Sequence, residues 1–142
     1  MRALLFLALV WVVPAAGQPT FICNSPTCCN IPDLPYVTDA DVAAACPGMA
    51  TLNDQGELTS MEASLHAFRL TTLQHVYLPN LQRVGGNFRA ELNDQLTSLE
   101  LGQLNYAGTG ISIQFNGALG EVDLRLLEYA GKWATHMCDV SL

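Results

Sequence analysis

Few side chains in this sequence have the types and spacings that catalysis or metal binding needs. The three histidines stand far apart, and the chain contains no Gly-x-Ser-x-Gly, phosphate-loop or His-Glu-x-x-His motif. The group His136-x-Cys138-Asp139 could form one corner of a metal site. Structural zinc takes four ligands, so this group is too small by itself. We therefore expect no catalytic residue, no bound metal and no cofactor, and a protein that is not an enzyme.

The cysteines are the other reactive side chains, and four of the five lie in one 24-residue segment. These four are disulfide candidates: Cys23, Cys28, Cys29 and Cys46. Two of them are adjacent, whereas zinc ligands usually leave about two to four residues between them, so disulfides are favoured over a metal. Four cysteines allow three connectivities. A Cys28–Cys29 bond would close a strained ring, and we expect each of these two to pair elsewhere.

Residues 1–17 have the features of a secretory signal peptide. Arg2 precedes an apolar run over residues 3–13, and small residues follow it. The run is shorter than the roughly 20 apolar residues of a transmembrane helix, and no second run of that length follows. We therefore expect a secreted chain, in the extracellular space or at a cell surface or wall, with no transmembrane segment.

The charge of the chain restricts its partners. Thirteen acidic and six basic side chains give a formal net charge of −7. Nucleic acids carry charge of the same sign, so we expect no nucleic-acid partner. An extracellular protein or a glycan is the kind of ligand that we expect instead.

A repeat of 23 residues is the most informative pattern in the sequence. Three apolar sets match at this offset: Leu73, Val76, Leu78, Leu81 and Val84; Leu96, Leu99, Leu101, Leu104 and Ala107; Leu119, Val122, Leu124, Leu127 and Ala130. A glycine follows each set. Repeats of this length are typical of solenoids, in which each unit is buried only by its neighbours. The sequence therefore predicts a mainly β fold, a short right-handed β-solenoid with 23-residue coils.

Two extended segments are expected in each coil. The alternation over residues 87–92 recurs over residues 110–115 and predicts a half-buried strand with six inward side chains: Phe88, Ala90, Leu92, Ile111, Ile113 and Phe115. A second, shorter strand contains Val76 and Leu78 and recurs with the same period. Continuing the alignment places His136 and Cys138 in the inward columns. Cys138 is then expected to be a small buried hydrophobe or to bond another chain.

The corners between strands have their own expected chemistry. The glycines are expected to supply positive φ at one corner. Asn93, Asn116 and Asp139 follow the long strand at the other corner, where Asn and Asp tolerate left-handed backbone and form a structural ladder. Upstream, two registers remain open. One aligns Met61 with Val84, and the other is shifted by one residue.

The segments before the repeat divide into an arm and a cap. Residues 18–37 are rich in Cys and Pro and predict an irregular arm. Residues 38–46 predict a short helix, because Thr38 or Asp39 can cap it and alanines fill it, and this helix would close one end of the solenoid. Residues 48–60 predict a polar loop or an imperfect first turn of the solenoid. The solenoid domain is expected over residues 38–142.

The coil Leu73-x-x-Val76-x-Leu78-Pro79-x-Leu81-x-x-Val84-Gly85-Gly86-x-Phe88-x-Ala90 resembles the receptor L domain, a leucine-rich-repeat-like module. That module forms the ligand-binding ends of insulin and epidermal growth factor receptors, and related repeats occur in fungal GPI-anchored cell-wall proteins. The resemblance covers residues 38–140. It implies the family's architecture and an extracellular protein-binding role, although this chain has fewer coils than a full L domain and no attached kinase.

The outward face of the long strands is the candidate ligand surface. Its candidate residues are Arg89, Glu91, Gln114 and Trp133. The third coil ends without a closing segment, which predicts a truncated domain, a homo-oligomer, or a partner that adds a strand at this edge.

We therefore expect a secreted, non-catalytic recognition module of receptor-L-domain type. One alternative is a structural wall or matrix component that assembles through its open end. Another is a β-helix enzyme acting on polysaccharides, which would need an acidic cluster on one outward face. The aligned outward positions hold Arg89, Ser112 and Thr135 instead.

Overall fold

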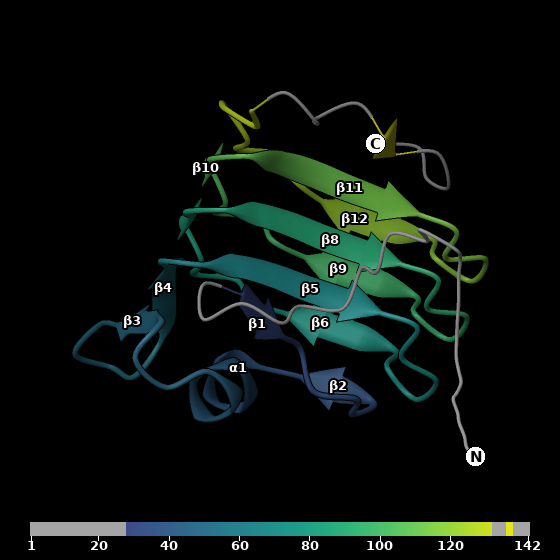
Figure 1. Ribbon diagram of the computed structural model, residues 1–142, viewed down its shortest axis with the longest axis horizontal. Helices are drawn as coiled ribbons and strands as arrows, with labels where there is room; N and C mark the ends of the chain where they lie inside the picture. The colour runs from purple at the N-terminus through teal and green to yellow at the C-terminus, as the bar shows by residue number, and fades with distance from the viewer. Residues whose placement is uncertain (1–27, 132–135, 138–142) are drawn as a thin grey trace, which may run out of the picture.

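The computed structural model of the protein describes residues 28–131 and the backbone of residues 136–137 (Figure 1). The predicted signal peptide, Cys23, Trp133 and Cys138 lie outside these residues. The described part is mainly β, with one short helix and with strands that pair almost entirely in parallel. The mainly β prediction is therefore confirmed.

Three sheets surround one core. The long sheet contains β1 (Cys28–Asn30), β5 (Ser64–Phe68), β8 (Asn87–Glu91), β11 (Gly110–Gln114) and β13 (His136–Met137), in that order. The short sheet contains β2 (Tyr36–Val37), β6 (His75–Tyr77), β9 (Ser98–Glu100) and β12 (Glu121–Asp123). The hairpin sheet contains β3 (Ala50–Leu52), β4 (Leu58–Met61), β7 (Arg83–Val84) and β10 (Tyr106–Ala107). In Figure 1 the short sheet lies behind the long sheet, and the hairpin sheet closes the left side.

The strands pair with an offset equal to the sequence repeat. Phe88 lies opposite Ile111 in the long sheet, Val76 opposite Leu99 in the short sheet, and Val84 opposite Ala107 in the hairpin sheet. Met61 pairs with Val84 and Leu65 with Phe88, so the unshifted upstream register is the one adopted. Residues of the same repeat position are therefore neighbours on adjacent strands.

The apolar positions of the repeat form the core. The first two sets, from Leu73 to Val84 and from Leu96 to Ala107, are fully buried. Each fully buried leucine contributes about 1.5–3 kcal/mol relative to an exposed one. Burial decreases in the third set, in which Val122, Leu124 and Leu127 are only partly buried. The core therefore thins toward β12.

A ladder of buried asparagines joins successive 23-residue repeats, here called turns, at the corner after the long strands. The Asn93 side chain accepts the Leu70 N–H at 2.9 Å and donates to the Ala67 carbonyl at 3.0 Å. One repeat later, the Asn116 side chain accepts the Asn93 N–H at 3.0 Å and donates to the Ala90 carbonyl at 2.8 Å. Both side chains are completely buried. The expected structural ladder is therefore present at these two positions.

The left-handed residues of this corner are not the asparagines, as we expected, but the residues before them. Leu92 and Phe115, which precede Asn93 and Asn116, have φ values of 60° and 58°, and Arg69, at the same repeat position before Leu70, has a φ of 55°. The left-handed backbone thus lies one residue before each asparagine, and the asparagine side chain binds backbone groups of the preceding repeat. As a consequence, Leu92 is only partly buried and Phe115 is 62% exposed. The prediction that these two side chains point inward was wrong.

The glycines of the opposite corner allow the backbones of adjacent repeats to approach closely, and most of them do not have a positive φ. Only Gly131 of the three repeated glycines has a positive φ, at 50°. A Cβ on Gly108 would lie 2.2 Å from the Gly85 carbonyl oxygen, and one on Gly86 would lie 2.1 Å from Ser64 Oγ. Stacked turns therefore meet here at a distance that excludes a side chain.

The N-terminal segment is more regular than predicted. Within the irregular arm that we expected over residues 18–37, β1 and β2 extend the long and short sheets. Residues 50–61 form the antiparallel β3–β4 hairpin in place of a loop, because Asn53 organises the turn: its side-chain oxygen accepts the N–H groups of Gln55 and Glu57.

Helix α1 (Asp39–Ala45) covers this end of the core, as predicted. The Asp41 carboxylate accepts hydrogen bonds from the Thr38 N–H and hydroxyl, which fixes the first turn. A disulfide between Cys29 and Cys46 ties β1 to the end of the helix, so Cys29 does not pair with its neighbour. Cys28 is also disulfide-bonded.

The last strand pairs with a different register from the one expected. His136 lies opposite Ser112, and Met137 opposite Ile113. The repeat had aligned His136 with Ile113, so the final connection contains one residue more than the earlier ones. The alignment of His136 with Ile113 was therefore wrong.

We expect Asn93→Ala to lower the free energy of unfolding by about 2–4 kcal/mol, because it leaves the partly buried Leu70 N–H and the buried Ala67 carbonyl without these partners. Urea denaturation followed by circular dichroism would measure this. The control is Asn105→Ala at an exposed position, expected to change stability by less than about 0.5 kcal/mol. Equal losses in the two variants would contradict a structural role for the ladder.

Candidate binding surfaces

Three of the four predicted ligand residues form one network on the outer face of the long sheet. The Arg89 guanidinium donates to both oxygens of Glu91, with Nη2 at 2.7 Å from Oε2. The Ser112 hydroxyl donates to the same carboxylate at 2.8 Å, and Gln114 Nε2 lies 2.7 Å from the Ser112 oxygen. Trp133, the fourth predicted residue, lies outside the described residues.

This network is largely satisfied by its own members. Glu91 is 5% exposed and Ser112 is 4% exposed, and their polar atoms form hydrogen bonds with each other. The neighbouring His66 is also buried, and its Nε2 lies 2.6 Å from Asn87 Oδ1. The predicted residues are thus brought together, in an arrangement that resembles a structural polar cluster.

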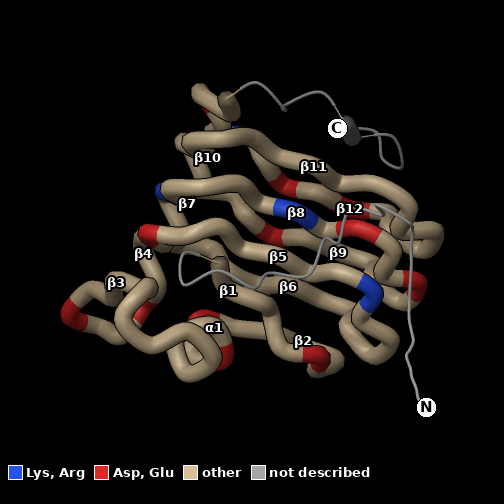
Figure 2. Tube along the Cα trace, in the orientation of Figure 1, with Lys and Arg blue, Asp and Glu red and all other residues tan. Residues whose placement is uncertain are grey.

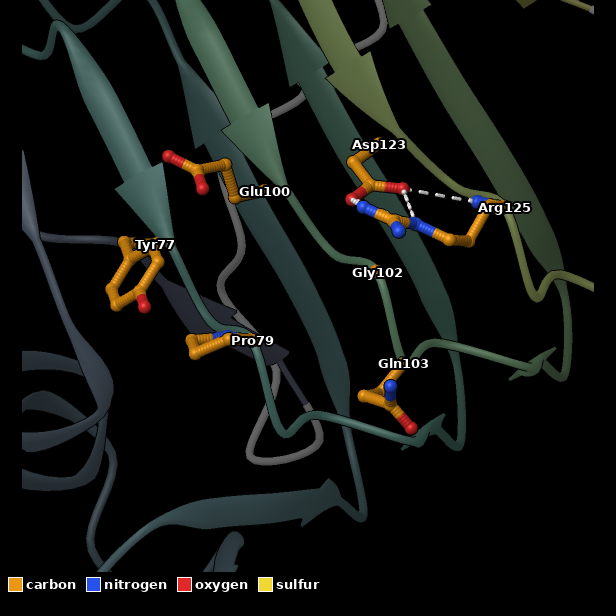
Figure 3. Close-up of a pocket in the computed structure, with 7 residues that line it drawn as sticks. All are labelled: Tyr77, Pro79, Glu100, Gly102, Gln103, Asp123 and Arg125. Atoms are coloured by element: carbon orange, nitrogen blue, oxygen red, sulfur yellow. Dashed lines mark hydrogen bonds and ion pairs between the residues drawn. The ribbon is translucent and has the colours of Figure 1, made fainter.

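A groove of about 240 Å³ lies on the outer face of the short sheet and was not predicted from the sequence (Figure 3). Its lining residues come from three successive turns: Tyr77, Pro79, Glu100, Gly102, Gln103, Asp123 and Arg125. A pattern in the sequence could have indicated this groove. Tyr77, Glu100 and Asp123 each stand between two apolar residues at the same position of the 23-residue repeat.

The strand register explains how these side chains meet. Tyr77 lies opposite Glu100, and Glu100 lies opposite Asp123. Adjacent strands are about 4.8 Å apart, so the three side chains form a row across β6, β9 and β12. Pro79, Gly102 and Arg125 form the parallel row in the turns that follow, as Figure 3 shows.

Asp123 and Arg125 form an ion pair at one end of the groove. Arg125 Nε donates to both carboxylate oxygens of Asp123, at 2.9 and 3.1 Å, and Nη2 donates to Oδ2. These hydrogen bonds favour the ionised carboxylate and hold the pKa of Asp123 below its usual value. The same interaction raises the pKa of Arg125.

Gly102 leaves room for this ion pair. A Cβ at Gly102 would lie 2.8 Å from Asp123 Oδ2, too close for the carboxylate to keep its place. The obstructing atom is the end of a movable side chain, so a methyl group here would displace the carboxylate without disturbing the backbone. Gly102 therefore shapes the groove.

An aromatic ledge adjoins the groove on its N-terminal side. The Tyr36 and Tyr77 rings are tilted with their centroids 6.2 Å apart, and His75 lies 5.5 Å from Tyr36. Tyr36 is 50% exposed and Tyr77 37% exposed. His75 is held in place by Ser98, whose Oγ lies 2.8 Å from Nδ1.

The arrangement suits binding better than proton transfer. Carboxylates that act as general acids have raised pKa values, whereas the pKa of Asp123 is lowered and both of its oxygens are occupied by Arg125. An aromatic ring, a carboxylate and an amide lie along one groove and can stack on or hydrogen-bond to a bound molecule.

No family model, curated protein or solved structure matches the chain. Within the described residues, no helix is both long and apolar enough to cross a membrane. The Cys29–Cys46 disulfide is consistent with an extracellular location.

We expect Arg125→Gln to raise the pKa of Asp123 toward its usual value, near 3.8, because the hydrogen bonds from the guanidinium are lost. In the unaltered protein the ion pair is complete at neutral pH and is lost as the pH falls through the depressed pKa. Carboxyl carbon NMR titration would measure both values. Arg83→Gln, in the hairpin sheet, is the control and should leave the Asp123 titration unchanged. An unchanged pKa in Arg125→Gln would contradict this account of the ion pair.

Proposed function

We propose that the protein is a secreted, non-catalytic recognition module built as a short right-handed β-solenoid of receptor-L-domain type. Support for the architecture comes from the strand registers, because adjacent turns of all three sheets pair at the offset of the sequence repeat. Support for secretion comes from the apolar N-terminal segment in the sequence and from the disulfide.

The groove on the short sheet is the observation that carries the recognition role. Its residues project from three stacked strands of a packed core, so their relative positions are fixed before a ligand arrives. Extracellular ligands that fit a groove of this size are a protein side chain or a sugar unit. We place the ligand surface here, with the Arg89–Glu91–Gln114 network as a neighbouring structural element of the long sheet.

A catalytic role has less support. The outward position shared by Arg89 and Ser112 lacks the acidic cluster that a calcium-dependent polysaccharide enzyme would need. In the groove, Arg125 occupies the carboxylate of Asp123, which leaves no pair of free carboxylates for acid–base chemistry.

A second candidate function is assembly through the β12 end of the core. Val122, Leu124 and Leu127 are only partly buried there, and Leu126 and Tyr129 are 44% and 51% exposed. Light scattering on the secreted protein, with and without reductant, tests this candidate. A concentration-dependent oligomer would favour it, and a stable monomer at micromolar concentration would count against it.

We expect the purified secreted protein to bind one class of ligand saturably on an array of extracellular proteins and glycans, without altering it. Gly102→Ala should weaken that binding about tenfold or more, because the added methyl group displaces the Asp123 carboxylate and occupies the groove. Gly120→Ala is the matched control, since a Cβ there meets nothing within 4 Å.

Biolayer interferometry on the array hits would provide the affinities. Equal affinities of the two glycine variants would move the ligand surface away from the groove. Absence of any saturable binding, or turnover of a polysaccharide on the array, would overturn the recognition role itself.

A further inference from the structure

We infer that the groove on the short sheet binds a lysine or arginine side chain of an extracellular protein partner, with Glu100 as its counter-ion. This inference rests on the proposed recognition function and adds the chemical class of the ligand. Four observations support it: the charge of the surface, the state of Glu100, the position of Tyr77 and the neutralised ion pair beside them.

The outer face of the short sheet is acidic. β9 and β12 carry three carboxylates, at Glu100, Glu121 and Asp123, and Arg125 is the cation that lines the groove. Figure 2 shows acidic positions along both strands. The chain as a whole has a formal net charge of −7. A cationic partner is therefore attracted both by the whole chain and by this face.

Glu100 is the carboxylate available to such a partner. Among the described residues its carboxylate has no hydrogen-bond or ion-pair partner, in contrast to Asp123, which is bound to Arg125. The Glu100 side chain is partly buried in the middle of the row, between Tyr77 and Asp123 (Figure 3). A partly buried carboxylate gains from a positively charged donor that replaces the water it has lost.

Tyr77 supplies the second contact for a cation. Its ring lies on the strand beside Glu100, at the opposite position in the register. An ammonium or guanidinium group bound by Glu100 therefore comes within reach of the ring, where the quadrupole attracts it. The methylene stem of the same side chain would lie against Pro79 and the ring of Tyr77.

The Asp123–Arg125 pair closes the groove without opposing the ligand. Because Arg125 donates to both carboxylate oxygens, the pair carries no net charge, and Glu100 determines the sign of the groove. A neutral sugar would use the same polar groups but would gain nothing from this charge. The unpaired carboxylate therefore favours a cationic peptide segment over a glycan.

The test uses a trilysine peptide with both ends blocked and the secreted full-length protein, in a fluorescence-polarisation titration at 50 and 300 mM salt. We expect saturable binding that weakens at the higher salt concentration. Glu100→Gln should weaken it about tenfold, since it removes a partly buried charged partner. Glu121→Gln is the matched control. It removes one charge from an exposed residue on the adjacent strand that does not line the groove, and should change affinity less than about twofold.

The outcomes separate this inference from the function on which it rests. Equal losses in Glu100→Gln and Glu121→Gln, or binding of a blocked triglutamate peptide as tight as that of trilysine, would overturn the inference. So would salt-independent, Gly102-sensitive binding of a neutral oligosaccharide, a result that leaves the recognition function standing. If no protein or glycan on the array binds, the recognition function itself fails. Tyr77→Leu, which keeps the apolar bulk but removes the aromatic face, should weaken trilysine binding about threefold.

Discussion

The structure depends on the register in which each turn of the chain stacks on the one before it. Backbone hydrogen bonds fix the spacing between strands but do not by themselves select one register from its neighbours. The buried asparagines at the corner add that selection, because Asn93 and Asn116 each bind the preceding turn at an N–H and at a carbonyl. A slip of one residue would exchange the inward and outward side chains of every strand and leave these amides unpaired in the core. In the correct register, the apolar side chains are buried and the amides of Asn93 and Asn116 are hydrogen-bonded at the same time.

The core could be predicted from the sequence because the repeat and the burial have the same cause. Leu78 and Leu101 occupy one column of the core, and only an apolar side chain fits there, so the pattern persists from turn to turn. The same logic identified the asparagine ladder, since an Asn recurs at a corner where backbone groups need partners. Helix α1 was predictable for a local reason: Thr38 and Asp41 form its cap without help from the rest of the fold.

The remaining features depend on contacts that the repeat does not encode. Phe115 continues the apolar alternation of its strand, yet the left-handed backbone that serves the asparagine ladder turns it outward. Neither β1 nor β2 belongs to the repeat, and each becomes a strand because the edge of an existing sheet offers it a partner. The shift at His136 follows from one additional residue in a connection, which no alignment at a constant offset can reveal. Sequence periodicity thus predicts the contacts that every repeat makes with the next. It does not predict the strands at the ends of the sheets or the local departures from the repeat.

The same distinction explains why the sequence drew attention to the long sheet and did not reveal the groove on the short sheet. Arg89 and Glu91 stood out because charged residues alternate with core residues along a long strand, but that strand is long enough for the two to satisfy each other. Tyr77, Glu100 and Asp123 are the last residues of their short strands, and the register places each of them beside its counterparts on the neighbouring strands. No core requirement keeps these positions alike, and their chemistry can differ from one turn to the next. A groove that joins an aromatic ring, an ion pair and a carboxylate with no partner in the described part of the chain is a consequence of that freedom on a framework whose spacing is already fixed.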